Sequence, residues 1–238
     1  MKRASSTNHA GGKRAREESH AEAGSDPKSD ESNAFRGATA VFSKFTTGTG
    51  GRNNLMEKLK QKTPIFEGII GYEDTVIPQL IHAILSEHNI NLLGLRGQAK
   101  TRIARSMVDL LDEFMPIVKG SEINDSPFEP ISKYARDKIA ELGEKTMVSW
   151  VHRSNRFFEK LATPDVNVSD LIGDIDPIKA ASLKLSYSDS RVIHFGMIPR
   201  AHRCIFVLNE LPDLQARIQV SLFSILQEKE IQIRGFKL

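Results

Sequence analysis

The stretch "INLLGLRGQAKTRIAR" at residues 90–105 constrains the fold more than any other part of the chain. Its first part, "INLLGL", has the length and composition of a short buried strand. A loop with two glycines follows, and apolar residues at helical spacing then predict a helix from about residue 102 through Phe114. This order of strand, glycine-containing loop and helix is what a phosphate-binding loop requires, so it predicts an α/β fold.

The loop "GLRGQAKT" contains the residue types that grip the phosphates of a nucleotide. Glycines let the backbone turn its N–H groups inward, the lysine can bridge the β- and γ-phosphates, and the threonine can offer its hydroxyl to Mg²⁺. We therefore predict that ATP contacts Gly94, Leu95, Arg96, Gly97, Gln98, Ala99, Lys100, Thr101 and Arg102, with Thr101 also a metal ligand. Ala99 stands where the common pattern has glycine, but alanine suits a first helical turn, so we expect the loop to form. The alternative is an ordinary strand-to-helix loop that happens to contain Lys-Thr.

The stretch "RCIFVLNELPDL" at residues 203–214 is the second candidate element. Its apolar run predicts a buried strand, which we expect beside the phosphate loop. Glu210 is predicted to orient and deprotonate the attacking water, and Asn209 to accept a hydrogen bond from a water molecule bound to Mg²⁺. Because asparagine adds no negative charge where aspartate is usual, the site is predicted to bind Mg²⁺ less tightly. The alternative is a buried strand that ends at a turn before Pro212.

Charge is unevenly distributed over the 238 residues. Residues 1–62 contain 12 Lys/Arg and 7 Asp/Glu, whereas the remainder contains 21 and 23. The near-neutral body argues against a nucleic-acid partner, although "WVHRSNRFF" interleaves bases with aromatic residues, as some single-strand-binding proteins do. Residues 1–62 are predicted to be a disordered basic tail with a short helix at "NLMEKLKQK", and residues 63–238 the folded domain. A single cysteine and no apolar run near ~20 residues predict a cytoplasmic protein without a membrane partner.

Further elements follow from hydrophobic periodicity and turn residues. Helices are expected at 76–85, 130–142 and 214–226, and strands at 147–151, 204–208 and 231–238. The stretch "SLKLSYSDSRVIHFG" predicts a hairpin that turns at residues 188–190. The clustered acids Asp170, Asp174 and Asp176 are interpreted as helix caps and turn residues rather than as a metal site.

Together these residues resemble the AAA+ ATPase module of bacterial magnesium-chelatase-like ATPases, which are related to the MoxR group. The resemblance rests on "GIIGYED", "GLRGQAKTRIAR", "ATPDVNVSDLIGDIDPIKA" and "GMIPRAHRCIFVLNELPDLQARIQVSLFSILQEKEIQIRG", and it covers about residues 65–238. The family's polar sensor residue, arginine finger and helical lid normally follow the last hairpin, where this sequence ends. The resemblance therefore implies the first part of an AAA+ module.

The resemblance implies a P-loop three-layer α/β sandwich with a central, mostly parallel sheet and β-hairpin insertions. It implies that Ile70 and Gly71 lie near the adenine, and that ATP and Mg²⁺ are bound between the subunits of a ring, expected to be a hexamer. Hydrolysis would then drive remodelling of a partner protein. Two alternatives stay open: a nucleotide-binding regulatory subunit with weak or no ATPase activity, which Asn209 suggests, and a nucleic-acid motor.

Overall fold

The computed structural model describes residues 39–43, 50–95 and 97–238. The strands in this part of the chain are β1 Thr39–Ser43, β2 Ile90–Leu92, β3 Phe114–Val118, β4 Val148–His152, β5 Phe157–Leu161, β6 Gly173–Ile175, β7 Ile193–Phe195, β8 Ile205–Asn209, β9 Gln232–Ile233 and β10 Phe236–Lys237. The α-helices are α2 Gly51–Lys60, α3 Val76–Leu85, α4 Lys100–Ser106, α5 Lys133–Leu142, α6 Val168–Leu171, α7 Pro177–Leu183, α8 Met197–Arg200 and α9 Ala216–Glu228. Short 3₁₀ helices include η1 Met107–Leu110, η4 Ser190–Val192 and η5 Leu211–Asp213.

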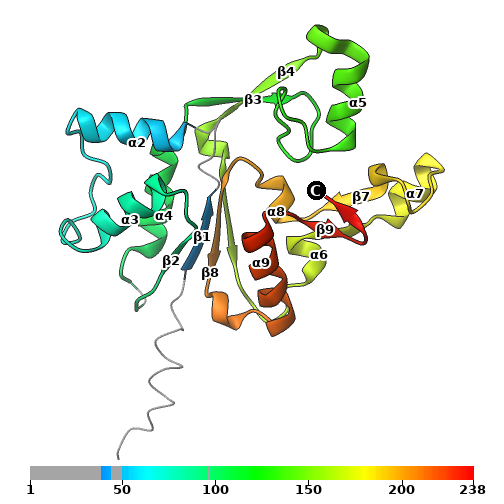
Figure 1. Ribbon diagram of the computed structural model, residues 1–238. Coiled ribbons are helices and arrows are strands. Elements are labelled where there is room, and N and C mark those ends of the chain that lie inside the picture. Colours follow the sequence, from blue (N-terminus) through cyan, green and yellow to red (C-terminus); the bar gives the residue numbers. More distant parts are fainter. Residues whose placement is uncertain (1–38, 44–49, 96) are drawn as a thin grey trace, which may run out of the picture.

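The central sheet has the strand order β2-β1-β8-β5 (Figure 1). β1 pairs antiparallel with both β2 and β8, and β5 pairs parallel with β8. Because β1 is antiparallel to both of its neighbours, β2, β8 and β5 all run in the same direction. The sheet is therefore mixed, and the prediction of a mostly parallel sheet is wrong.

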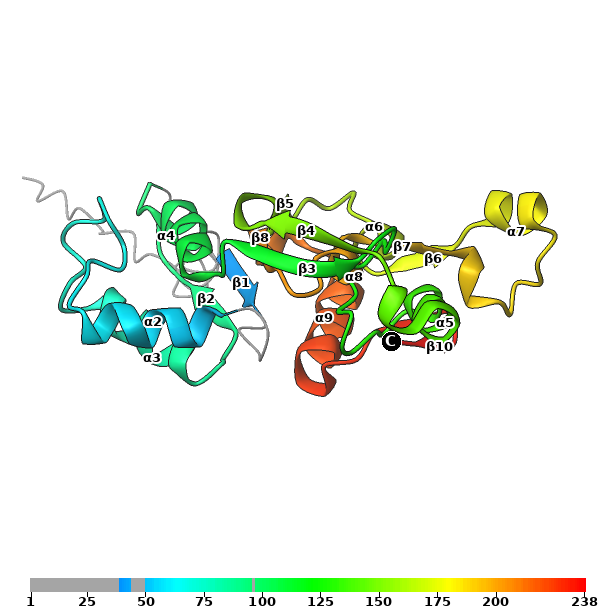
Figure 2. The same ribbon diagram turned by 90° about the horizontal axis from the view of Figure 1, so that it is seen from above.

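Alternating side chains of β8 face two apolar cores, one on each side of the sheet. Ile205 and Val207 belong to a core formed with α2, α3 and α4, whereas Phe206 and Leu208 belong to a core formed with α6, α8 and α9. Figure 2 shows these two groups of helices on opposite sides of the sheet. All four side chains are at most 3% exposed, which explains why this strand reads as a continuous apolar run.

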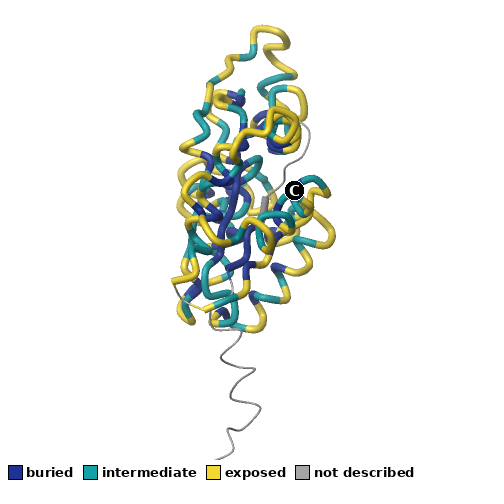
Figure 3. The backbone as a smooth tube through the Cα atoms, turned by 90° about the vertical axis from the view of Figure 1, so that its left-hand side faces the viewer, coloured by how far each residue is buried: buried dark blue, intermediate teal, exposed yellow. Residues whose placement is uncertain are grey.

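A second unit projects from the sheet, at the top of Figure 1. β3 and β4 form an antiparallel ribbon beside α5, and residues 119–132 connect the ribbon to the helix. Figure 3 shows the buried residues concentrated along the middle of the molecule, with mostly exposed residues towards the end of the projecting unit.

The carboxylate of Asp125, which is 0% exposed, organises the connection to α5. One oxygen accepts from the backbone N–H groups of Ile131 (2.8 Å) and Ser132 (2.9 Å). The other accepts from the hydroxyls of Ser132 (2.6 Å) and Ser121 (2.7 Å). Burial raises the pKa of Asp125, but these hydrogen bonds outweigh burial and hold the pKa below its ordinary value. Every oxygen of this buried carboxylate is thus satisfied within the fold.

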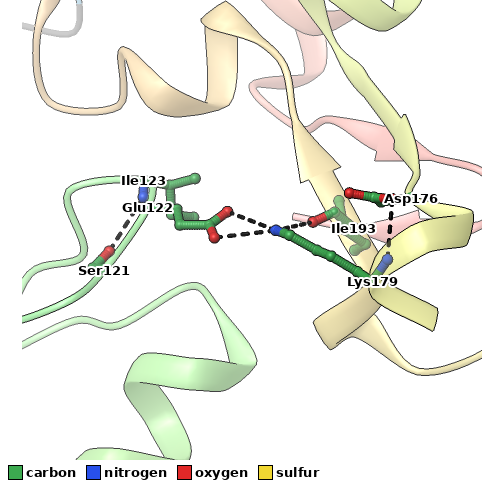
Figure 4. Close-up of polar contacts among 6 residues, drawn as sticks. All are labelled: Ser121, Glu122, Ile123, Asp176, Lys179 and Ile193. Atoms are coloured by element: carbon green, nitrogen blue, oxygen red, sulfur yellow. Dashed lines mark hydrogen bonds and ion pairs between the residues drawn. The ribbon is translucent and has the colours of Figure 1, made fainter. Parts of the chain in front are cut away.

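A lysine joins the projecting unit to β7 (Figure 4). Lys179 Nζ lies 3.1 Å from the carboxylate of Glu122 and donates to the carbonyl of Ile193 at 3.3 Å. Asp176 caps the helix that carries this lysine by accepting from the N–H of Ile178 (2.8 Å) and of Lys179 (3.1 Å). Asp170 takes part in a capping box with Asn167 at the start of α6. Asp170 and Asp176 therefore stabilise helix ends, as predicted. Asp174 does not, because it lies in β6 and its carboxylate pairs with Arg234 at 2.9 Å.

Several predicted elements have other bounds or another type. The tail was expected to be disordered to residue 62, but β1 and α2 lie within it, and α2 covers residues 54–60 of the short helix predicted at 54–62. Residues 1–38 and 44–49 of that tail lie outside the described residues. Phe114, expected at the end of a helix, begins β3 instead. The hairpin expected around residues 188–190 is replaced by α7 and η4, and β7 pairs with β6.

Candidate functional site

The two predicted motifs reach the same edge of the central sheet. Thr39 of β1 is in register with Leu92, where β2 ends, and also with Asn209, where β8 ends. Both motifs therefore start at the same level, separated by one strand, or roughly 10 Å at the usual strand spacing. The strands that lead into the two motifs, β2 and β8, were expected to be neighbours. They are not, because β1 lies between them. The carboxyl edge of such a sheet is where α/β proteins commonly bind ligands.

The loop between β2 and α4 closes around its own lysine. Lys100 Nζ donates to the carbonyls of Gly94 (2.8 Å) and Leu95 (2.6 Å), so the ammonium is fixed over the start of the loop. A Cβ on Gly94 would lie 2.2 Å from the Gln98 side-chain oxygen, and its φ of 154° is also one that glycine adopts readily. An ammonium has three donors, so two bonds to the loop leave capacity for an anion.

Ala99 differs from what its position predicted. It has φ 57° and ψ 15°, in the left-handed region, and it stands just before the first residue of α4 rather than in the first helical turn. Its carbonyl still accepts from the N–H of Ile103 at 2.9 Å, so the helix begins normally. A left-handed residue with a Cβ is strained, which explains why glycine is usual at this place in the pattern.

The segment predicted to lie near the adenine is next to the loop. Tyr72 donates its hydroxyl to the carbonyl of Gln98 at 3.4 Å, and a Cβ on Gly68 would come within 2.6 Å of the Arg102 guanidinium. Gly71 donates its N–H to Glu73 at 2.8 Å. Large apolar side chains are exposed in the same segment and in the loop: Ile70 85%, Leu93 59% and Leu95 69%. Exposed apolar surface beside a cationic loop suits a purine base attached to a phosphate chain.

The remaining loop predictions have these outcomes. Thr101 lies in the first turn of α4 and is half-buried, and Gly97 is exposed with φ 84°. Arg96 lies outside the described residues.

Asn209 ends β8 with a half-satisfied amide. Its Nδ2 donates to Glu159 Oε1 of β5 at 2.7 Å, whereas its Oδ1 is buried and has no hydrogen-bond partner. Glu210 follows with φ 57°, and η5 begins after it. Sequence reasoning missed Glu159, although a glutamate inside the apolar run "FFEKL" is a detectable signal.

A bound Mg²⁺ would need few protein ligands here. Among the described residues, no group of three or more His, Cys, Asp or Glu side chains is arranged to hold a metal ion. Magnesium that is bound with a nucleotide takes most of its ligands from phosphates and water, with one or two from the protein. The orphaned Asn209 Oδ1 is a buried acceptor of the kind that a metal-bound water satisfies. The unpaired Asn209 oxygen therefore fits a hydrated Mg²⁺ that would accompany a nucleotide. Thr101, predicted as the second protein partner, lies in the first turn of α4.

Two cavities lie elsewhere. One of about 270 Å³ is lined mostly by apolar residues, among them Ile198 of α8, Leu222 of α9 and Cys204. A second, of about 120 Å³, lies near β2 and α9. No residue of the loop 93–101 lines either one. Apolar walls do not hold phosphates, so the loop stays the better candidate for an anion.

The basic residues of "WVHRSNRFF" are not all available to a ligand. Arg156 is 0% exposed and donates to the carbonyls of Arg203 (2.9 Å) and Asp112 (3.3 Å). Burial lowers its pKa. Arg153 lies 3.9 Å from Asp109. Arg156 therefore stabilises the fold, which weakens the nucleic-acid interpretation. In the described part of the chain, no helix is both long and apolar enough to cross a membrane.

Comparison of the chain with models of protein families, with curated proteins and with solved structures gives no match.

Proposed function

We propose that this chain binds ATP together with Mg²⁺ at the carboxyl edge of its central sheet and hydrolyses it. The observation that carries this proposal is the loop that closes on Lys100, at the same level of the sheet as the unsatisfied oxygen of Asn209. The first is a fixed cation with glycines around it, and the second is a buried acceptor without a donor. A triphosphate with its hydrated metal ion supplies what both of them lack.

The residues of the site divide the work. Lys100 offsets the negative charge of the β- and γ-phosphates, and the backbone N–H groups of the loop donate hydrogen bonds to the remaining phosphate oxygens. Glu210 holds the attacking water and takes its proton. Thr101 and Asn209 hold the hydrated Mg²⁺, which, when bound, offsets charge that develops on the phosphates.

The wider activity follows from the resemblance of the sequence to AAA+ ATPases. We propose that the chain works in a ring, expected to be a hexamer, and that ATP turnover remodels a protein partner. A second candidate is a regulatory subunit that binds nucleotide with little turnover. The amide at residue 209 favours it, because an amide adds no charge to the metal site.

Binding of a fluorescent ATP analogue tests the loop directly. Lys100→Ala is expected to weaken binding roughly 10- to 100-fold, the loss of one charge-assisted hydrogen bond of about 1.5–3 kcal/mol. The matched control is Lys145→Ala, because Lys145 is exposed and lies in another part of the molecule. Equal affinity of the native chain and Lys100→Ala, or no binding by either, would contradict the proposal.

Hydrolysis separates the two candidates. Glu210→Gln is expected to keep nucleotide affinity and to lose phosphate release, because an amide cannot take a proton from water. If the native chain binds ATP through Lys100 but releases no more phosphate than Glu210→Gln, the regulatory function is the better description.

A further inference from the structure

Three side chains form a polar chain from the strand end at Asn209 to the helix that follows the loop. Asn209 Nδ2 donates to Glu159 Oε1 at 2.7 Å, and Arg105 Nη2 of α4 donates to Glu159 Oε2 at 2.6 Å. The Arg105 guanidinium carbon also lies 5.9 Å from the centre of the Phe157 ring. The Glu159 side chain is 24% exposed and that of Arg105 is 65% exposed. Glu159 is therefore the middle residue of the three, and each of its carboxylate oxygens accepts a hydrogen bond from one of the other two.

Glu159 fixes which way the amide of Asn209 points. An ionised carboxylate only accepts hydrogen bonds, so it can face the NH₂ group of an asparagine but not its oxygen. A flipped amide would bring two oxygens together and lose the bond to Nδ2. Nitrogen and oxygen diverge from the same carbon atom, so holding Nδ2 towards β5 turns Oδ1 away from that strand. This is the oxygen that is buried and has no hydrogen-bond partner.

We infer that Glu159 is a positioning residue for magnesium: it holds the Asn209 amide so that Oδ1 accepts from a water molecule of the hydrated ion. This rests on the proposed function, because the ion arrives with the nucleotide. Arg105 holds the second carboxylate oxygen of Glu159, so the helix after the phosphate loop sets the glutamate in place. The altered motif Asn-Glu is in this way completed by a carboxylate on the neighbouring strand.

The test is a magnesium titration at a fixed concentration of a fluorescent ATP analogue, with bound analogue as the readout. In Glu159→Gln, Arg105 engages the new side-chain oxygen and leaves an NH₂ group facing Asn209. Asn209 then flips and turns its oxygen away from the metal. The Mg²⁺ midpoint is expected to rise about tenfold or more, as is usual for residues that orient metal ligands. Affinity for the analogue without Mg²⁺ is expected to stay unchanged.

A second substitution added to the first supplies the rescue. In the double variant Glu159→Gln with Asn209→Asp, one oxygen of the new aspartate accepts from the new glutamine, and the other faces the metal. The midpoint is expected to return to the native value or below it. Glu159→Asp retains the charge but is one methylene too short, so it is expected to raise the midpoint as Glu159→Gln does. It provides a second measurement if the glutamine variant does not fold.

A merely structural role for Glu159 predicts a different result. Urea unfolding would then show lower stability for Glu159→Gln, while the Mg²⁺ midpoint stays at the native value, and this result would overturn the inference. A double variant with the same midpoint as Glu159→Gln would overturn it too. If the native chain binds no analogue, or binds it equally well after Lys100→Ala, the proposed function fails and this inference fails with it. If binding of the analogue depends on Lys100 but the Mg²⁺ midpoint is the same with and without Glu159, the inference fails and the proposed function stands.

Discussion

Asp125 is a buried residue, and Asn209 is a half-buried one whose amide oxygen is buried, but only Asp125 has a hydrogen-bond partner for each of its side-chain oxygens. The carboxylate of Asp125 receives four hydrogen bonds from Ser121, Ile131 and Ser132, all within the same stretch of chain. The amide of Asn209 is held on one side only, and its oxygen has no partner. A satisfied buried group holds a fold together, whereas an unsatisfied one at the end of a strand has a place for something that the protein does not itself supply.

Substitution of Asp125 is expected to have the largest effect on stability. Asp125→Asn places an NH₂ group against donors and removes the charge that they stabilise, so the free energy of unfolding should fall by roughly 3 kcal/mol. Urea unfolding measures it, with Asp165→Asn as a control at an exposed position. Affinity for the ATP analogue should not change in the folded protein. A loss of affinity as large as the loss of stability would break the distinction between the two regions.

Acid should remove part of the same contribution. The pKa of Asp125 lies below its ordinary value of 3.8 in the folded chain, so the unfolded chain binds the proton first as pH falls. The stability that Asp125 contributes is therefore fully present above about pH 5 and is lost as pH falls through the folded pKa. Unfolding free energies measured from pH 6 to pH 2 should fall more steeply for the native chain than for Asp125→Asn. Parallel curves would mean that the hydrogen bonds to this carboxylate add nothing.

The smallest effect is expected within the loop 93–101. Ala99→Gly removes a Cβ from a left-handed residue, which relieves about 1 kcal/mol of strain, while the added freedom of the unfolded chain offsets part of it. A net gain of roughly 0.5 kcal/mol in the free energy of unfolding is expected, together with equal or tighter nucleotide binding. For the free energy of unfolding, Gln98→Gly is the control, because it adds the same freedom to the unfolded chain at a neighbouring residue that is not left-handed. A loss of stability in Ala99→Gly would show that the left-handed conformation is not strained.

Much of the secondary structure was predictable from local pattern. The helix predicted at 76–85 is α3, and those predicted at 130–142 and 214–226 correspond to α5 and α9. Their apolar residues recur at helical spacing, and Gly143 ends α5 as expected. β8 was also predicted, because a strand buried on both faces leaves an unbroken apolar run.

The errors come from contacts between distant parts of the chain. Phe114 has helical spacing from Leu110 and Leu111, but η1 ends at Leu110 and the pairing of Phe114 with His152 starts a strand. β1 is only five residues long and lies in a polar segment, so composition hid it. The role of Glu159 depends on its hydrogen bonds with Asn209 and Arg105, which are far from it in sequence. None of these contacts leaves a local periodicity to detect.

β1 also has a mechanical consequence. Residues 39–43 hydrogen-bond to the strand that leads into the loop and to the strand that ends at Asn209, so no backbone bond joins those two strands directly. Strand β1 therefore joins β2 to β8. Without it, the edges of β2 and β8 that now pair with β1 would have no hydrogen-bond partner in the sheet. Its partners on β8 lie more than 160 residues away in the sequence. The loop after β2 and the end of β8 are therefore aligned only once this long-range strand pairing has formed during folding.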